Sequence, residues 1–201
     1  MACSEAKLQE RHDIVSEVLK ITRAGNPILR ETMPQLTVEE ILLPETQELI
    51  ADIRYTNETK KSGVGLAAPQ VGARLALSVI GIKPTPNRPD REPFDSVIIN
   101  PAYEGVGRRA SMWEGCQSFG QGNNLLFGKA LRYKVIDASW YDENADFHEQ
   151  RLGGFVAHVF QHETDHLNGI LFVDRVRDSK TFMLADEYRK RIVKKDKKTT
   201  S

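Results

Sequence analysis

Gln161-His162-Glu163-Thr164-Asp165-His166 is the segment in which the chemistry of this sequence is concentrated. His162 and His166 are four residues apart, so on an α-helix their imidazoles share one face and can bind one metal ion. Glu163, beside the first histidine, can reach a water at that ion and act as a general base. The pattern His-Glu-x-x-His is typical of metal-dependent hydrolases. Taken alone, the segment also fits a surface helix with two histidines and several acids.

The residues around this segment predict a buried helix over residues 155–167, because positions 155, 156, 159 and 160 are apolar. Asn168-Gly169 ends it. Periodicity predicts other helices over residues 8–19, 45–57 and 181–192, and a capped turn at 37–40. Strands are expected over 74–82, 96–99 and 170–173, with two more inside 125–141. Turns are expected at Asn100-Pro101 and at Asp142-Glu143-Asn144, the second closing a hairpin.

Length and composition suit one soluble domain. The chain has 201 residues, of which 40% are hydrophobic and 28% charged. We expect a single domain over residues 1–193 and a charged, flexible tail over 194–201. The formal net charge is zero, so we expect neither DNA nor a membrane as partner. Apolar runs are too short to span a bilayer and the start lacks a signal peptide, so we expect a cytoplasmic location.

Cys116 is the expected third ligand. With Cys3 it is one of only two cysteines, which argues against a disulfide framework and fits a reducing compartment. Cys116 lies between Gly115 and Gln117, whereas a merely buried cysteine usually sits among apolar residues. It lies 162 − 116 = 46 residues before the first histidine, so a fold must bring them together. Together with the two histidines it would leave one metal position open, as catalytic sites do.

An oxyanion that develops at such a site needs hydrogen-bond donors. The backbone N–H of Gln117 and the side-chain amide of Gln70 are the candidates. Gln70 is the one polar side chain of residues 63–72, a segment of small residues that lets the backbone approach a ligand closely. The segment lacks the Gly-Lys-Ser/Thr signature of a phosphate loop, and its alternative is a tight turn between a helix and a strand.

Two other metallopeptidase classes use the same histidine pair. A metzincin needs a third histidine six residues after His166, but Phe172 stands there, which excludes that class. A thermolysin-like enzyme takes a downstream glutamate, for which Glu187, 187 − 166 = 21 residues after His166, is a candidate. That assignment leaves Cys116 and residues 63–72 without a role.

Three segments resemble the three motifs of the peptide deformylase family, in order and at similar spacing: Gly63-Val64-Gly65-Leu66-Ala67-Ala68-Pro69-Gln70, Glu114-Gly115-Cys116-Gln117-Ser118 and Gln161-His162-Glu163-Thr164-Asp165-His166. The resemblance covers roughly residues 21–175. It implies an α+β fold, with antiparallel sheets packed around a central metal-binding helix and a C-terminal helix. It also implies a hydrolase that removes the formyl group from N-formyl-methionyl nascent peptides and releases formate, in a bacterial cytoplasm or an organelle of bacterial descent.

Carried over to this chain, the resemblance implies four kinds of site residue. The metal ligands are Cys116, His162 and His166; the acid and base is Glu163; the donors to the formyl oxygen are Gln70 and Gln117; and the substrate contacts are Val64 and Gly65, with Gly115 beside them. His158 is unusual: it lies four residues before His162 on the same helix face, so we expect it to line the substrate pocket or to support a ligand from behind, and a direct metal ligand or plain packing are the alternatives. The metal of this family is typically Fe²⁺, and Zn²⁺, Ni²⁺ or Co²⁺ can occupy the site. The donor set by itself favours zinc.

The chain departs from this family in two places. Gln117 replaces the leucine that usually follows the cysteine, and residues 123–128 lack the usual arginine. The alternative function is therefore a deformylase-like protein that binds metal and peptide with altered or lost turnover. Asp165 is expected either to orient a ligand imidazole or to form an ion pair on the helix surface. The basic residues 194–198 are either a contact for the ribosome or a solvated tail.

Overall fold

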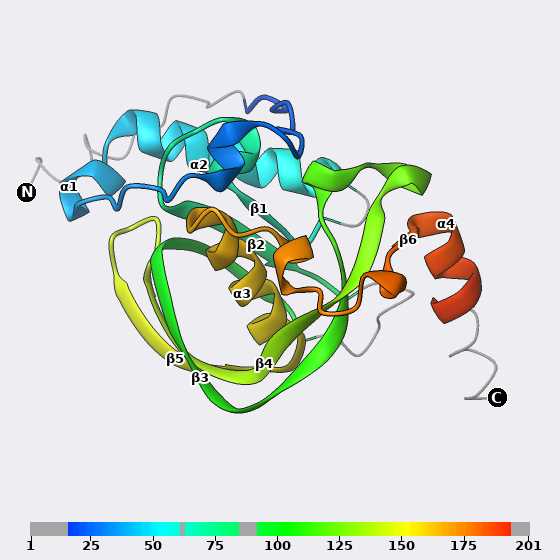
Figure 1. Ribbon diagram of the computed structural model, residues 1–201. Helices are drawn as coiled ribbons and strands as arrows, with labels where there is room; N and C mark the ends of the chain where they lie inside the picture. Colours follow the sequence, from blue (N-terminus) through cyan, green and yellow to red (C-terminus); the bar gives the residue numbers. More distant parts are fainter. Residues whose placement is uncertain (1–15, 61–62, 85–91, 194–201) are drawn as a thin grey trace, which may run out of the picture.

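The computed structural model describes residues 16–60, 63–84 and 92–193. Within these ranges six strands form one antiparallel sheet with the order β1-β2-β3-β4-β5, and β6 pairs with β4. Figure 1 shows the sheet curving around one central helix, α3. The expected α+β class is confirmed. The strands are β1 (Gly65–Ala67), β2 (Leu77–Ile82), β3 (Phe94–Gly115), β4 (Leu126–Tyr141), β5 (Phe147–Gly153) and β6 (Met183–Leu184).

Four α-helices accompany the sheet: α1 (Val38–Ile41), α2 (Pro44–Thr59), α3 (Gly154–Leu167) and α4 (Ala185–Tyr188), the last continued by a π-helical turn, Arg189–Val193. No helix in the described ranges is both long and apolar enough to cross a membrane. Short 3-10 turns connect the elements at Pro27–Arg30, Ala68–Val71, Gln117–Phe119, Gly122–Asn124, Phe172–Arg175 and Ser179–Thr181.

Strand β2 is buried on both faces, which explains its nearly continuous apolar sequence. Leu77 and Val79 belong to a core cluster shared with α2, whereas Ile80 and Ile82 belong to a second cluster shared with α3. The same division recurs on β3, where alternate residues join different clusters. These two strands therefore separate two apolar cores and seat α3 in one of them.

Helix α3 is also held to β4 by one polar side chain. Gln161 accepts a hydrogen bond from the Tyr133 N–H and donates one to the Tyr133 carbonyl, both at 2.9 Å. It donates a further bond to the Ala157 carbonyl at 2.8 Å. Gln161 is almost fully buried, and a buried amide has to be satisfied in this way. These bonds fix the position of α3 against the sheet, one residue before its first metal-binding candidate.

Several expected boundaries are confirmed. Thr37 and Glu40 form a capping box at α1, with each backbone N–H bonded to the other side chain, at 2.7 and 3.2 Å. Pro44 occupies the first turn of α2, where its missing N–H costs no helical bond. β4 and β5 form the hairpin expected around residues 142–144.

The turn expected at Asn100-Pro101 is wrong, because β3 continues through these residues. The register between β3 and β4 shifts at this point, and such an irregularity accommodates a proline that cannot donate to the ladder. Asn100 has a φ of +50°, and its side chain donates to the Leu36 carbonyl at 2.7 Å and accepts from the Leu36 N–H at 2.9 Å. Those two bonds hold the irregular backbone in place without ending the strand.

Other expected elements also differ. Residues 170–173 do not form a strand but lead into the 3-10 turn Phe172–Arg175, where the Asp174 carboxylate accepts the Leu171 N–H at 2.8 Å. Residues 125–141 hold one strand rather than two, and the C-terminal helix begins at Ala185, after β6. Residues 16–19 of the helix expected over 8–19 are not helical. The rest of that helix and the tail at 194–201 lie outside the described ranges.

We predict that Leu29→Ala lowers the free energy of unfolding by about 2–5 kcal/mol, because Leu29 is 0% exposed in the cluster shared with α2. The matched control is Leu42→Ala. Leu42 is 54% exposed at the end of α1, and its loss is expected to change stability by less than about 0.5 kcal/mol. Urea unfolding followed by circular dichroism measures both, and equal losses would contradict this description of the core.

Candidate metal centre and active site

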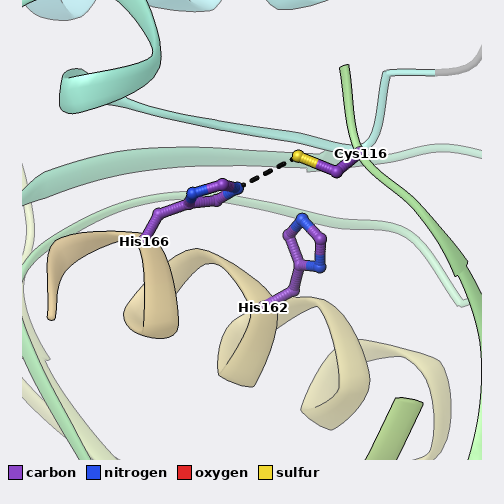
Figure 2. Close-up of side chains that lie close together, drawn as sticks. All are labelled: Cys116, His162 and His166. Carbon is purple, nitrogen blue, oxygen red and sulfur yellow. Dashed lines mark hydrogen bonds between the residues drawn. The ribbon is translucent and has the colours of Figure 1, made fainter. Parts of the chain in front are cut away.

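Three possible metal-binding side chains lie close together: two from α3 and one from the residue that follows β3. Cys116 directly follows β3, whereas His162 and His166 are on α3, one turn apart. One donor atom from each residue lies within 4.8 Å of the other two, and Cys116 Sγ is 3.3 Å from His166 Nε2. Figure 2 shows both imidazoles rising from α3 on the side where the sulfur lies. The structure thus brings together the three residues expected to bind metal.

This donor set fits a divalent metal ion. Bonds of about 2.0–2.3 Å to nitrogen and thiolate keep the donors of one ion within a few ångström of each other, as they are here. Cys116 and His166 are 2% and 1% exposed. Glu163 is buried next to them, and its Oε2 has no hydrogen-bond partner among the residues that the structure describes. Three donors beside an unpartnered carboxylate oxygen suit a catalytic site with one open position.

The other candidate for third ligand, Glu187, lies elsewhere. It is on α4, where its carboxylate is 2.9 Å from Lys190 Nζ and 2.6 Å from Arg191 Nε. Lys190 and Arg191 lower the pKa of Glu187 through these hydrogen bonds. The geometry therefore favours Cys116, and not Glu187, as the third metal donor.

Glu114 was not expected to belong to the site. Its carboxylate is buried, and its Oε2 is 2.7 Å from His162 Nδ1. Arg132 donates to both carboxylate oxygens, from Nε at 2.7 Å and from Nη2 at 3.1 Å. A carboxylate behind a metal-binding histidine fixes the orientation of its ring. The signal that could have located Glu114 is its place two residues before Cys116, because alternate residues of a strand share a face.

Arg132 is a second buried charge that sequence reasoning missed. It is 1% exposed and bridges Glu114 to Asp165. Asp165 is also buried and accepts hydrogen bonds from Arg175 at 2.6 and 2.9 Å. Of the two roles expected for Asp165, the ion pair is confirmed, although it lies inside the protein and not on the helix surface. Charges of opposite sign are paired here because an isolated buried charge would be strongly destabilising.

Burial and the neighbouring charges together shift the pKa values of the site residues. Burial raises the pKa of Glu163 to about 7. Burial alone would also raise the pKa of Glu114, but Arg132 and two histidines hold it well below its usual range. Burial lowers the pKa of His166, and electrostatic interactions with His162 and Arg132 lower it further. The lowered pKa of His166 favours the neutral imidazole that binds a metal, and a pKa of Glu163 near 7 suits a group that takes and gives a proton.

Gln70 reaches the site from the 3-10 turn Ala68–Val71 and is 2% exposed. Its Nε2 donates to Cys116 Sγ at 3.4 Å and to Ser118 Oγ at 3.2 Å. Its Oε1 accepts from the Ala67 N–H at 3.0 Å, which turns the donor end of the amide toward the sulfur. The structure thus brings Gln70 to Cys116, as a donor at the site requires.

Gln117 is the first residue of the 3-10 turn that follows Cys116, so its N–H has no partner inside that turn. Its carbonyl accepts a hydrogen bond from Arg23 Nη1 at 3.2 Å. The nearby segment 123–128 has no arginine of its own, but Arg189 donates to the Asn123 side chain. An arginine from the C-terminal turn therefore contacts the segment in which the sequence lacks one.

The two glycines expected near the substrate, Gly65 and Gly115, both have close side-chain neighbours. Gly65 opens β1, and a Cβ at this position would lie 2.2 Å from Glu163 Oε1. A Cβ at Gly115 would lie 3.0 Å from the ring of Phe127. Val64 is partly buried and packs against the cluster around α3. Glycine at position 65 is thus what makes room for the Glu163 carboxylate.

His158 lies one turn before His162 on α3 and is 4% exposed. Its Nε2 is 2.9 Å from Glu114 Oε1, and its Nδ1 is 3.3 Å from Met112 Sδ. Both ring nitrogens therefore face atoms of the protein itself. Of the roles expected for His158, these contacts favour support of a ligand from behind, because its ring lies on the carboxylate that also contacts His162.

The chain matches the family model described as polypeptide deformylase over residues 18–182. It is 35% identical over 185 residues to peptide deformylase 2 of Nostoc sp., covering 90% of this chain and 98% of that protein. It is 37% identical over 168 residues to a peptide deformylase of Leptospira biflexa, with coverages of 82% and 91%. The crystal structure of a class I type b peptide deformylase from Acinetobacter baumannii, bound to Met-Ala-Ser, is similar with a TM-score of 0.73. It is 29% identical and covers 80% of this chain and 99% of that chain.

We predict that Cys116→Ala abolishes stoichiometric metal binding, because only two of the three clustered donors remain. Glu187→Ala is the control and should keep the native metal content, since that carboxylate pairs with Lys190 and Arg191 instead. Elemental analysis of anaerobically purified protein measures both. Metal retained in the cysteine variant but lost in the glutamate variant would reverse the assignment of the third ligand.

Proposed function

The chain belongs to the polypeptide deformylase family and is a metal-dependent peptide deformylase, and we propose that it acts on N-formyl-methionyl peptides. The observation that carries this function is the convergence of Cys116, His162 and His166 beside the buried carboxylate of Glu163. The reaction consumes one water, breaks the bond between the formyl carbon and the methionine nitrogen, and yields formate and a free amine.

The relative from Acinetobacter baumannii supports this substrate, because it was solved with Met-Ala-Ser, a peptide that begins with methionine. The alternative function, peptide binding without turnover, would not require the general base or the donors to the formyl oxygen. Glu163 is present and buried at the metal centre, and Gln70 contacts Cys116. The residues to which we assign turnover are therefore present at the site, which supports turnover despite the unusual Gln117.

The chain's own groups can be assigned steps in this hydrolysis. A divalent ion held by the three donors would polarise the formyl group and lower the pKa of water. Glu163 takes the proton from the attacking water and gives it to the amine nitrogen as the C–N bond breaks. Gln70 Nε2 and the Gln117 N–H donate hydrogen bonds to the formyl oxygen as it gains negative charge.

The metal we propose is Fe²⁺, which the resemblance to deformylases implies. One thiolate and two imidazoles also suit Zn²⁺, Ni²⁺ and Co²⁺, so availability in the cell selects among these ions as much as affinity does. The protein's contribution is the same for each ion: it supplies the donors and keeps one position accessible.

The remaining proposals concern the surroundings of the site. Val64 lines the pocket for the methionine side chain, Gly65 bonds the substrate backbone, and Gly115 borders the same site. Residues 1–193 form one catalytic domain, and the charged tail at 194–201 is available to the ribosome. Neither DNA nor a membrane is a proposed partner. Formyl-methionine begins chains in bacteria and their organellar descendants, so we place the protein in a bacterial cytoplasm or such an organelle.

We predict that Glu163→Ala lowers kcat for formate release from formyl-Met-Ala-Ser at least about 100-fold, because the proton carrier is lost. The metal content should stay native, since the three donors are unchanged. Glu149→Ala, an exposed glutamate on β5, is the control and should leave kcat unchanged. If the Fe²⁺-loaded native protein releases no more formate than Glu163→Ala, the binding-only alternative holds.

We predict that Gly65→Ala lowers kcat at least about 10-fold while metal content stays native, because the new Cβ would displace the Glu163 carboxylate. Gly153→Ala is the matched control: its Cβ would meet no atom within 4 Å, and its φ of −131° suits alanine. Formate release and elemental analysis measure both variants. A Gly65→Ala enzyme of native kcat would show that the carboxylate tolerates displacement.

A further inference from the structure

The Glu114 carboxylate is saturated by its neighbours. Oε1 lies 2.7 Å from Arg132 Nε and 2.9 Å from His158 Nε2. Oε2 lies 3.1 Å from Arg132 Nη2 and 2.7 Å from His162 Nδ1. Each oxygen thus has two nitrogen partners, one from the guanidinium and one from an imidazole. The planar guanidinium fixes one edge of the carboxylate, and two histidines of α3 fix the other.

This geometry determines where the two imidazoles carry their hydrogens. Arginine is always charged, and a carboxylate bonded to it through both oxygens is an acceptor at both. The nitrogens that face it therefore carry hydrogen, which places N–H on His158 Nε2 and on His162 Nδ1. His162 then has its Nε2 lone pair for a metal.

Only one of the two metal-binding histidines is oriented by a side chain in this way. His162 Nδ1 is bonded to Glu114, whereas His166 Nδ1 is buried without a partner among the described residues. The orientation of His162 therefore depends on where the Glu114 carboxylate sits. Without His158, Oε1 would keep only Arg132 Nε, and the carboxylate could move along the guanidinium edge away from His162.

Two other roles for His158 fit the contacts less well. As a metal ligand it would need a nitrogen near the cluster of Cys116, His162 and His166, and it is not part of that group. As a substrate contact it would need a free nitrogen, but Nε2 faces Glu114 and Nδ1 faces Met112 Sδ.

We propose that His158 is a positioning residue for the metal centre: its Nε2–H holds Glu114 Oε1, so that Glu114 Oε2 keeps the His162 ring turned with Nε2 toward the metal. The proposal rests on the metal site of the proposed function. It adds a histidine outside the His-Glu-x-x-His pattern, one turn earlier on the same helix, that acts through Glu114 and touches neither metal nor substrate.

Three substitutions at one position separate the hydrogen bond from the volume of the ring. His158→Gln places an amide N–H near the position of Nε2 and should preserve the bond. His158→Asn is polar but too short to reach Glu114, and His158→Leu removes the donor. The matched control is His148→Leu, which breaks a histidine–carboxylate pair of similar length, 2.8 Å to Asp142, at the β4–β5 hairpin.

The protein is loaded with Co²⁺, whose visible absorption spectrum reports the geometry of its donors, and metal release to a chelator is timed. We expect the Leu and Asn variants to release Co²⁺ about 10-fold faster or more, with a changed spectrum. Their kcat should fall while KM for formyl-Met-Ala-Ser stays within about twofold. The Gln variant and the His148→Leu control should stay within about threefold of the native protein in every readout.

Two results would overturn the proposal. If the Leu and Asn variants keep native release rates and spectra, His158 has only a packing role. If the Gln variant is as impaired as the Leu variant, the loss of the hydrogen bond is not the cause of the impairment. If the variants fail to fold, ¹⁵N NMR of the imidazoles in the native protein tests the proposal instead. A His158 ring that carries hydrogen on Nδ1 alone would contradict it. Failure of the proposed function is separate: the native protein would bind no Co²⁺ or release no formate.

Discussion

Arg132, on β4, is buried between Glu114 of β3 and Asp165 of α3, and this one guanidinium ties together the three elements that surround the site. A buried guanidinium is strongly destabilising unless it is paired, and here two buried carboxylates pair with it. The β3–β4 register pairs Arg132 with Ala110, four residues before Glu114 on the same strand, so the long arginine side chain reaches along the sheet to the carboxylate. The pairing of two strands thereby contributes to the position of the carboxylate that contacts the His162 ring.

Much of the site could be predicted from the sequence because metal ligation restricts residue type and spacing. His162 and His166 share a helix face through local geometry alone, and Cys116 was found by its polar surroundings and by a resemblance that spans three motifs. Gln70 was singled out as the one polar side chain of residues 63–72 and by the same resemblance. Glu114 and Arg132 were missed because charged residues are usually exposed. Their burial depends on strand register and on Asp165, which lies 33 residues beyond Arg132.

The errors in the fold have a common origin. Asn100-Pro101 has the composition of a turn, but two hydrogen bonds to Leu36, 64 residues earlier, keep β3 continuous through it. Residues 170–173 are apolar enough for a strand, but the Asp174 side chain closes a 3-10 turn there. Short runs carry no periodicity that separates these outcomes, so contacts distant in the chain decide them. The longer helices, α2 and α3, were placed correctly because their patterns extend over several turns.

The donors of the site come from the end of a strand and from a helix 46 residues later, so a bound ion is also a cross-link within the fold. Any ligand that binds only the folded chain stabilises it, by about 2.7 kcal/mol at a hundredfold excess over its dissociation constant. A cell short of the metal ion would therefore hold an enzyme that is both idle and more easily unfolded and degraded. Through Cys116, the abundance of the protein becomes coupled to the nutrient supply.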